Sequence, residues 1–482
     1  MNFKLIVSIL GFLIMCVGIA MLAPIPFSLH YGDADVNALL VSSAICVFTG
    51  ILLWRVFRRP GEELRVRDGF LIVTLGWISV SLFGSIPFMI SGAVPSFTDA
   101  FFETMSGFTT TGASILRDVE RLPHGILFWR SFTHWMGGMG IIVLSLAVLP
   151  FLGIAGMQLY KAEAAGPTKD KLSPRIGETA RLLWGVYVLL TVLEVIFLRI
   201  GGMSLFDSLC HAFGTIATGG FSTKNSSIGF YKSAYVDAVV TVFMFLSAMN
   251  FALHYAALSG NIKAYLRNSE WKFFVMVLAG AVCVVTVVNF VHGQYPTLLE
   301  SLRFSAFNVV SVSTCTGFAT TDFALWIPAA QIVLLLLMFP GGCAGSTSGA
   351  IKQVRVFLLL RNTLTELKKL IHPKAVVPVR FCGQPVEPEI LSTIAAFFAT
   401  YVAVFAIASL FMTILGLDIV SAVSATATCM AGCGPGLGSV GPMSNYADVP
   451  TIGKWLLSVC MLLGRLELFT VFVIFTKAFW RA

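Results

Sequence analysis

Thr-Thr-Thr-Gly-Ala-Ser at residues 109–114 is one of four short breaks that interrupt the apolar sequence of this 482-residue chain. Each break follows an apolar stretch of about 10 residues, which is too short to cross a bilayer and is typical of a re-entrant half-helix. The key glycines, at positions 112, 219, 317 and 434, lie 107, 98 and 117 residues apart. The pattern predicts a fourfold repeat of span, half-helix, break and span. The other breaks read Ala-Thr-Gly-Gly-Phe-Ser-Thr at 217–223, Thr-Cys-Thr-Gly-Phe-Ala-Thr at 314–320 and Gly-Cys-Gly-Pro-Gly at 432–436.

The composition is that of an integral membrane protein. Hydrophobic residues make up 57% of the chain and charged residues 12%, whereas soluble domains have about 45–50% and about 25%. The net charge of +8 does not indicate a nucleic-acid partner, because the basic residues form short blocks between apolar runs rather than one binding face. The ten cysteines include no CxxC pair, so neither a zinc site nor a disulfide framework is predicted.

Ten segments are long and apolar enough to cross a bilayer as helices. Short basic connections alternate with the longer ones that hold the breaks. Of the 32 Lys and Arg residues, 23 fall on the basic side, together with both termini, and the positive-inside rule makes this side cytoplasmic. The expected spans are 5–27, 36–57, 69–91, 126–152, 180–200, 234–258, 271–292, 326–360, 389–416 and 452–479.

The expected fold class is an all-α integral membrane protein, with two N-terminal helices and four like-oriented repeats around a pseudo-fourfold pore. A Ser or Thr stands three residues before an acid at the start of three half-helices, which is close to capping-box spacing. The negative end of each half-helix would then point toward its break and favour a cation there. The expected boundaries are 1–60 for the N-terminal pair and 61–160, 161–262, 263–365 and 366–482 for the repeats.

Four like-oriented breaks would place backbone carbonyls around one opening. Carbonyl oxygens can replace the hydration shell of a weakly hydrated monovalent cation, and glycine permits the backbone angles that this needs. The predicted ligand is therefore K⁺, bound only at this selectivity filter. The residues expected to form the filter are Thr110, Thr111, Gly112, Thr218, Gly219, Thr316, Gly317, Cys433 and Gly434.

Residues 340–350 cannot form a continuous stable helix, because Pro340 and several glycines interrupt it. This unwound segment is either a packing kink or a flexible obstruction below the filter. Arg465 lies within the last expected span, where a charge normally faces protein or water; its partner could be Glu467 or an acid of a neighbouring helix. The residues singled out in these two places, to which the resemblance described next assigns gating, are Gly341, Gly342, Gly345, Ser346, Thr347, Ser348, Gly349 and Arg465.

Over its whole length the chain resembles the TrkH/KtrB/HKT superfamily of potassium-translocating membrane subunits. The four breaks, the two extra N-terminal helices and the segments 133–140 and 461–467 carry the resemblance, which is greatest to the TrkH branch. The fourth break departs from the pattern, since glycine and cysteine precede Gly434. The resemblance implies K⁺ uptake across the bacterial inner membrane, a gating loop at 341–350, a barrier to cations at Arg465 and a homodimer.

The resemblance also implies a cytosolic nucleotide-binding regulatory ring of the TrkA type as partner, which could dock on the basic segment from Arg361 to Glu389. No GxGxxG motif with a spaced acid occurs in the sequence, so NAD or ATP is expected on that partner and no organic cofactor on this chain. The alternative function is an H⁺- or Na⁺-coupled K⁺ symporter with alternating access. An enzyme is not expected, because no nucleophile–base pair or metal cluster lies within the spans.

Overall fold

The computed structural model describes residues 1–58, 65–148, 176–375 and 377–481. The regular secondary structure of the described residues is helical, except for one antiparallel hairpin of β1 (Arg380–Phe381) and β2 (Gln384–Pro385). The expected all-α fold class is therefore confirmed. Some of the basic residues that orient the chain lie outside the described residues, namely Arg59, Lys161, Lys169, Lys171 and Arg175.

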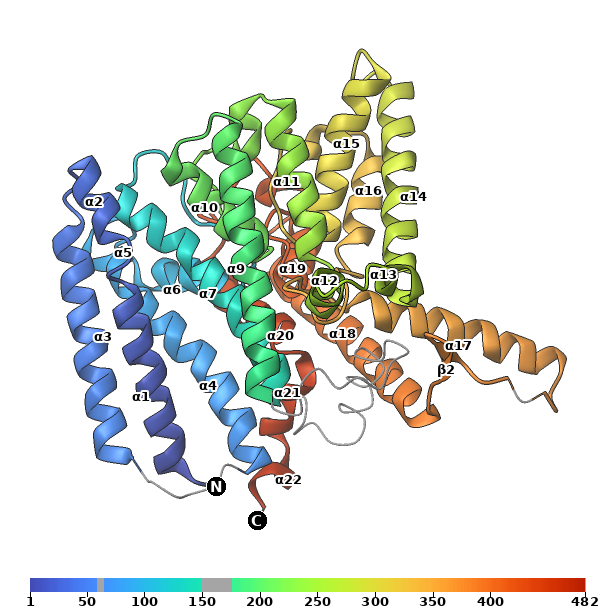
Figure 1. The fold of residues 1–482 in the computed structure, drawn as a ribbon, viewed down its shortest axis with the longest axis horizontal. Coiled ribbons are helices and arrows are strands. Elements are labelled where there is room, and N and C mark those ends of the chain that lie inside the picture. The colour runs from blue at the N-terminus through green and yellow to red at the C-terminus, as the bar shows by residue number, and fades with distance from the viewer. Residues whose placement is uncertain (59–64, 149–175, 376, 482) are drawn as a thin grey trace.

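Two N-terminal helices, α1 (Phe3–Ala20) and α3 (Val36–Phe57), are joined through the short α2 (Ile25–Tyr31). Glycines let the two backbones approach closely: a Cβ added to Gly11 would lie 2.9 Å from the Gly50 carbonyl oxygen, and one added to Gly50 would lie 2.6 Å from that of Gly11. Small residues at a helix crossing favour tight packing within a membrane. The pair stands beside α4 (Val66–Gly84) at one edge of the molecule (Figure 1).

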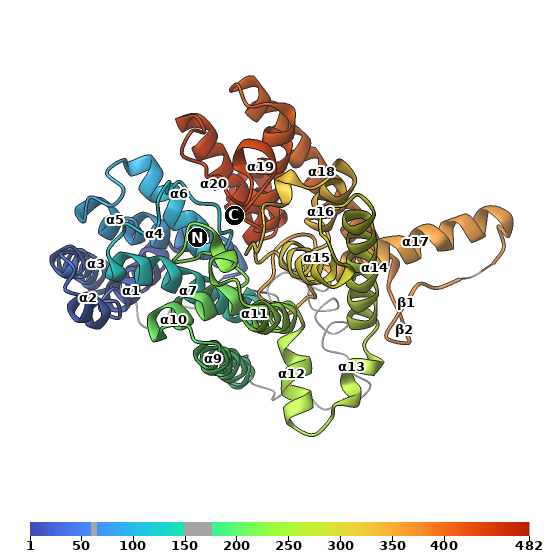
Figure 2. The same ribbon diagram turned by 90° about the horizontal axis from the view of Figure 1, so that it is seen from above.

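The remaining helices form four groups that follow one another around a common centre (Figure 2). Their half-helices are α6 (Phe97–Phe108), α10 (Leu205–Ile216), α15 (Leu298–Ser313) and α19 (Ile419–Ala431). The flanking elements are α5 (Ile86–Ile90), α7 (His124–Val148), α9 (Ile176–Ile200), η2 (Ser227–Tyr231), α11 (Ala234–Ser247), α12 (Phe251–Leu258), α13 (Lys263–Arg267), α14 (Ser269–Val291), η3 (Phe323–Leu325), α16 (Pro328–Leu337), α17 (Gln353–Ile371), α18 (Pro388–Ile414), η4 (Gly438–Val440), α20 (Thr451–Arg465), α21 (Leu468–Phe472), η5 (Val473–Phe475) and α22 (Lys477–Trp480).

Three of the expected spans are not single helices. The described residues contain six helices that are long and apolar enough to cross a membrane, or eight if two bent pairs each count as one span. The first pair, α11 and α12, replaces the span expected at 234–258 and bends by 101°; the second replaces the span at 452–479 and bends by 111° between Arg465 and Leu468. The span at 326–360 is divided by the non-helical residues between α16 and α17.

The starts of the half-helices agree with the capping pattern. Each N-cap side chain accepts a hydrogen bond from the backbone amide three residues later, at 2.9–3.4 Å. This bond satisfies one of the amides that a helix start leaves free. All four half-helices therefore begin at a defined residue and run toward the centre; the N-caps are Ser96, Ser204, Thr297 and Asp418.

The amphipathic helix α17 leaves the body of the molecule and projects sideways together with the β-hairpin (Figure 1). The first part of this helix is anchored, because Val354 and Leu358 are each 1% exposed, whereas its last turns carry exposed leucines. Both termini of the described chain lie at the same end of the molecule (Figure 1). The charge distribution predicts that both termini lie on one side of the membrane, and that this side is cytoplasmic stays a prediction.

Candidate ion-conducting site

The four half-helices end in the same hydrogen bond. In each break, one residue donates its amide proton to the carbonyl oxygen five residues earlier, at 2.7–2.9 Å. Four segments of different sequence therefore share one backbone geometry, and the donors define equivalent positions. The donor and acceptor pairs are Thr111 and Ser106, Gly219 and Gly214, Thr316 and Ser311, and Cys433 and Thr428.

Positive φ angles flank each of these donors. The residues that follow the donors are all glycines, with φ between 79° and 84°: Gly112, Gly220, Gly317 and Gly434. The residues that precede them also have positive φ, although three carry side chains: Thr110 (53°), Thr218 (54°), Cys315 (57°) and Gly432 (73°). A left-handed residue with a side chain costs roughly 1–2 kcal/mol, so the surrounding protein must hold these strands in place.

The counterpart of Gly112 in the second repeat is Gly220, and the sequence-based assignment of Gly219 to that position was wrong by one residue. Gly219 instead occupies the position of Thr111, Thr316 and Cys433. The error arose because the second break contains two consecutive glycines, and the sequence alone does not say which of them has the positive φ. Thr218 and Gly219 remain part of the same strand.

The four strands close into a ring. A Cβ added to Gly112 would lie 2.0 Å from the Gly219 carbonyl oxygen. The equivalent glycine of each repeat likewise lies close to a carbonyl of the next repeat, and the glycine of the fourth repeat contacts the first. Each carbonyl therefore stands against the backbone of the neighbouring strand, where only glycine fits. The remaining contacts are Gly220 with the Thr316 oxygen (2.1 Å), Gly317 with the Cys433 oxygen (2.1 Å) and Gly434 with the Thr111 oxygen (2.7 Å).

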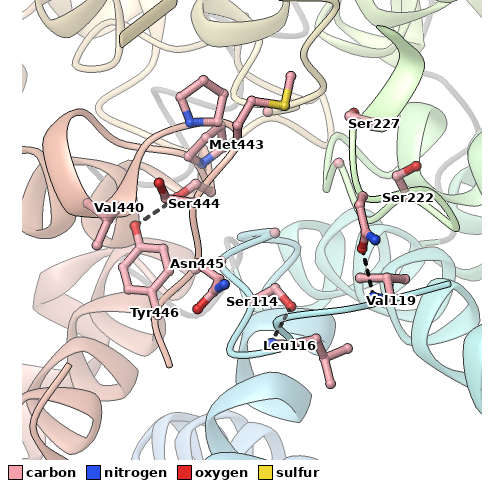
Figure 3. A pocket seen from close by; sticks show the side chains of 18 of the residues that line it. Ser114, Leu116, Val119, Ser222, Ser227, Val440, Met443, Ser444, Asn445 and Tyr446 are labelled. Carbon is pink, nitrogen blue, oxygen red and sulfur yellow. Dashed lines mark hydrogen bonds between the residues drawn. The ribbon is translucent and has the colours of Figure 1, made fainter. Parts of the chain in front are cut away.

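The four glycines also line one cavity of about 130 Å³ (Figure 3). Its wall includes Ser114, Ser222 and Tyr446, which come from three different repeats. No group of three or more metal-ligating side chains occurs among the residues that the structure describes. The ring itself presents the backbone carbonyl oxygens of Gly219, Thr316, Cys433 and Thr111 at its contacts, and such oxygens suit a monovalent cation.

A buried ion pair supports the first two strands from behind. The Arg130 Nε donates to the Glu103 Oε1 at 2.6 Å, with side-chain exposures of 4% and 0%. Glu103 also accepts from the Ile115 amide and the Ser114 hydroxyl, both at 2.9 Å, while the Arg130 Nη1 donates to the Ser222 carbonyl at 3.0 Å. The pair thus connects the strand of the first repeat to that of the second. Both Glu103 carboxylate oxygens and two Arg130 nitrogens form hydrogen bonds, which a buried ion pair needs to offset the cost of burying its charges.

The ring of Phe221 lies between two side chains of α7. The Arg130 guanidinium lies 3.5 Å from the centre of this ring, and the His134 ring stacks on it at 4.0 Å with an interplanar angle of 14°. Arg130 and His134 are four residues apart and therefore share one helix face. A Cβ on Gly219 would lie 2.2 Å from the His134 Nδ1, so the helix packs directly behind the strand of the second repeat.

Outside the ring, side chains hold the loops of neighbouring repeats together. The Tyr446 hydroxyl donates to the Gly434 carbonyl at 2.8 Å, and the Tyr446 amide donates to the Ser114 carbonyl at 2.8 Å. The Asn225 side chain accepts from the Val119 amide (2.8 Å) and donates to Asp118 (2.9 Å), as Figure 3 shows in part. This hydrogen bond to the exposed Asp118 carboxylate lowers its pKa.

Four acids on or next to the half-helices and breaks are engaged by other side chains or by backbone amides. Glu103 pairs with Arg130, and Asp99 accepts a hydrogen bond from the Lys454 ammonium at 2.6 Å. Asp207 accepts from the hydroxyls of Thr223 and Ser204, at 2.6 and 3.0 Å, and Asp322 caps η3. These carboxylates therefore act as structural groups.

The non-helical residues 338–352 pass directly beneath the strands. The Thr347 hydroxyl donates to the Ile216 carbonyl (2.9 Å) and the Ser348 hydroxyl to the Thr314 carbonyl (2.8 Å). A Cβ on Gly349 would lie 2.1 Å from the Ala431 oxygen. This segment thus contacts the inner ends of the second, third and fourth half-helices. Thr347 and Ser348 are at most 1% exposed, and the segment fills the space between the half-helix ends.

Arg465 contacts this segment. Its Nη1 donates to the Thr347 carbonyl at 2.7 Å and its Nη2 to the Gly137 carbonyl at 3.2 Å. The alternative that Arg465 pairs with Glu467 is wrong, because Glu467 forms an ion pair with Arg355 at 2.6 Å. The bend after α20 separates the two side chains, and the guanidinium is hydrogen-bonded to carbonyl groups beneath the ring.

The buried Glu270 was missed by the sequence analysis. Its Oε1 accepts from the Ala344 amide at 2.7 Å and from the Val354 amide at 3.0 Å. It therefore fixes both the segment beneath the ring and the start of α17, where a carboxylate also complements the helix dipole. The sequence does show an acid at the start of an apolar helix, which could have marked Glu270 as unusual. It does not reveal the partners of Glu270, because these lie more than 70 residues away along the chain.

Comparisons with known proteins agree with this geometry. The sequence profile of the TrkH family, described as cation transport protein, matches residues 37–481. The chain is 42% identical to the Trk system potassium uptake protein TrkH of Halomonas elongata and 41% identical to that of Escherichia coli K12, over 100% of each chain. The crystal structure of the potassium transporter TrkH from Vibrio parahaemolyticus matches with a TM-score of 0.92 and 39% identity over 100% of both chains. The chain is thus a transport protein rather than an enzyme, and it belongs to the TrkH family of cation transport proteins.

Proposed function

We propose that this protein takes up K⁺ across the bacterial inner membrane through the ring of backbone carbonyls. The observation that carries the proposal is the closed cycle of contacts in which Gly112, Gly220, Gly317 and Gly434 each lie against a carbonyl of the next strand. K⁺ loses its hydration shell at low cost when carbonyl oxygens replace the water. The names of the relatives support the same ion, because the proteins that are similar over their full length are named potassium uptake proteins.

Purified protein in proteoliposomes tests this function. Uptake of ⁸⁶Rb⁺ should follow an imposed K⁺ gradient, and the reversal potential should shift with K⁺ but not with Na⁺ or pH. A reversal potential that moves with pH or Na⁺ would instead indicate the coupled symporter. Glu194 favours that alternative: it is fully buried in α9, and neither carboxylate oxygen has a hydrogen-bond partner among the described residues. A Glu194→Gln variant with a pH-independent reversal potential would then identify the coupling group.

The segment at 341–350 is proposed to be the gate and Arg465 its electrostatic barrier. The segment lies beneath the ring and contacts three half-helix ends, so ions that leave the ring must displace it. The Arg465 charge is held there by carbonyl groups, and no carboxylate among the described residues forms an ion pair with it. A cation in the same space would meet an uncompensated positive charge in a region of low dielectric constant.

Removal of this charge should increase basal ⁸⁶Rb⁺ flux by about tenfold, which corresponds to a barrier lower by about 1.4 kcal/mol. Arg465→Gln removes the charge while it keeps a donor for the Thr347 carbonyl, and Arg465→Lys keeps the charge. We expect higher flux in the first variant and nearly unchanged flux in the second. Equal increases in both would show that the hydrogen bonds, not the charge, restrain the segment.

We also propose that the projecting part of α17 forms the contact between two copies of the chain. Leu360, Leu364, Leu367 and Ile371 are 51–74% exposed and recur at intervals of four, three and four residues, which is the spacing of a coiled-coil seam. On a helix that stands away from the body, such a stripe is left without a partner in one chain.

Introducing two acidic side chains into this apolar stripe should dissociate the dimer. The double variant Leu364→Glu/Leu367→Glu is expected to elute as a monomer in size-exclusion chromatography with light scattering, because like charges would face each other across the seam. Glu366→Ala, on the polar side of the same helix, is the matched control and should remain dimeric. A dimer in both variants would place the interface elsewhere.

The regulatory partner is proposed to be a cytosolic, nucleotide-binding ring that carries the NAD or ATP site. Basic residues gather on α17, on the hairpin and on the connection between them, at Arg361, Lys368, Lys369, Lys374 and Arg380, on the side that also holds both termini (Figure 1). They offer an electrostatic docking surface for an acidic partner face. On this arrangement the termini are cytoplasmic and the carbonyl ring is reached from the periplasm.

A further inference from the structure

The second strand of the ring lacks a side chain where the other three strands have one. Thr111, Thr316 and Cys433 carry side chains at this position, whereas Gly219 does not. The hydroxyls of Thr111 and Thr316 each share a hydrogen bond with the threonine two residues earlier, at 2.8 Å. The Cys433 thiol donates to the Val312 carbonyl at 3.5 Å. In three strands, the side chain at this position is therefore bonded to a neighbouring group.

The His134 imidazole fills the place that a side chain of Gly219 would take. A Cβ added to Gly219 would lie 2.2, 2.5 and 2.6 Å from the Nδ1, Cγ and Cε1 atoms of His134, which are the three atoms nearest to it. The backbone of Gly219 does not itself forbid a side chain, because its φ lies outside the left-handed region. The imidazole from the first repeat therefore stands in for the missing side chain of the second.

Packing rather than hydrogen bonding holds this imidazole in place. His134 is 0% exposed, and neither ring nitrogen has a hydrogen-bond partner among the residues that the structure describes. Its ring stacks on that of Phe221, with centroids 4.0 Å apart, and the Arg130 guanidinium contacts the same phenyl ring. Buried polar groups are normally hydrogen-bonded, so a histidine that makes no such bond acts here through its flat shape.

Gly219 is thus fixed from two sides, by His134 and by the first strand. The Gly219 carbonyl oxygen is the atom that lies 2.0 Å from a Cβ built on Gly112. The backbone of α7 has no room to move toward the ring, since a Cβ on Gly137 would lie 1.9 Å from the Phe108 carbonyl oxygen. The thickness of the imidazole therefore determines where this carbonyl of the ring lies.

We propose that His134 is a positioning residue that sets the ion preference of the ring by holding the Gly219 carbonyl in place. The inference rests on the proposed function, in which the carbonyls of the ring select K⁺. Without the imidazole, a space remains behind the second strand, and the surrounding groups relax partly into such a space. The strand then moves away from the centre. Both the width of a filter and the arrangement of its carbonyls act on the preference for K⁺, so the preference decreases.

Exchange of the two residues tests the fit between them. His134→Ala opens the space, and Gly219→Cys gives the second strand the residue of the fourth, in which an alanine also stands two residues earlier. Each single change should lower the preference of ⁸⁶Rb⁺ uptake over Na⁺ by about tenfold, the first through the space and the second through overlap of its Cβ with the imidazole. Residues in contact are not additive, and the double variant should return to within about threefold of the unchanged protein.

Thermal stability in detergent gives a second measurement, which does not depend on transport. Gly219→Cys should lower the melting temperature where His134 is present, because the site is overfilled, and raise it in His134→Ala, because the thiol fills the space. Met21→Ala is the matched control. Met21 is buried at the end of α1, outside the four repeats, so its loss should lower the melting temperature without a change in ion preference.

Additive losses in the double variant would overturn the proposal. If Gly219→Cys does not fold by itself, His134→Ala and the double variant decide: a preference in the double variant no higher than in His134→Ala is the contrary result. Stability that returns without the preference, while Gly112→Ser does alter the preference, would leave His134 a purely structural role. An unaltered preference in Gly112→Ser as well would instead overturn the proposed function, and the fit between the two residues would stand on the melting temperatures.

Discussion

Replacement of Gly112 by serine should lower ⁸⁶Rb⁺ uptake by about 100-fold, equivalent to about 2.7 kcal/mol, and remove its preference over Na⁺. Two independent reasons lead to this expectation. The Cβ would lie 2.0 Å from the Gly219 carbonyl oxygen, so one of the two strands must shift. The φ of 82° also disfavours any side chain. Uptake into proteoliposomes with and without competing Na⁺ measures both effects.

Gly280→Ser is the control for this variant. Gly280 lies in α14, and a Cβ there would meet no atom within 4 Å, so its flux should match that of the unchanged protein. Gly220→Ser should behave as Gly112→Ser does, since its Cβ would lie 2.1 Å from the Thr316 oxygen. Unchanged flux and unchanged ion preference in Gly112→Ser would remove the filter assignment.

The second large effect is expected from the Glu103–Arg130 pair. Glu103→Gln leaves the Arg130 charge buried without its carboxylate, and breaking a buried pair in this way costs about 3–5 kcal/mol. The apparent melting temperature in detergent should therefore fall by several degrees. The first strand also loses the carboxylate that accepts from Ser114 and Ile115, so the ion preference should weaken together with stability.

A double variant separates these two roles. Glu103→Leu/Arg130→Met removes both charges and fills a similar volume, and such replacements are often neutral or stabilising. Thermal stability should largely return. The ion preference should not, because the Ile115 amide and the Ser222 carbonyl have lost their partners. Recovery of both properties would show that the pair serves stability alone.

The sequence was a reliable guide where local chemistry determines structure. Three of the four N-caps, the half-helices and the interruption near Pro340 all follow from short-range patterns of hydroxyl residues, acids, glycine and proline. Local patterns were insufficient for the register of the second strand, because both Gly219 and Gly220 can adopt a positive φ and only contact with Thr316 distinguishes them. The bends of 101° and 111° were missed because the apolar helices on either side of each short break are together long enough to be counted as one span.

The residues behind the ring could not be inferred in the same way. The partners of Glu103, Glu270 and Tyr446 are set by how the repeats pack, at sequence separations that no periodicity reveals. Glu103 lies in an apolar stretch near the break, and this local context gives no indication of its partner. Its partner Arg130 is 27 residues away on another helix, and only tertiary packing brings the two groups together.

The contact between Gly434 and the Thr111 carbonyl has a consequence for how the protein is made. This contact closes the ring and joins residues that are 323 positions apart, and contacts between such distant residues form late in folding. During synthesis the first three repeats enter the membrane before the strand of the fourth exists. A chain that stops before residue 434 cannot complete the ring, so the proposed path for ions does not exist until the fourth strand has been made.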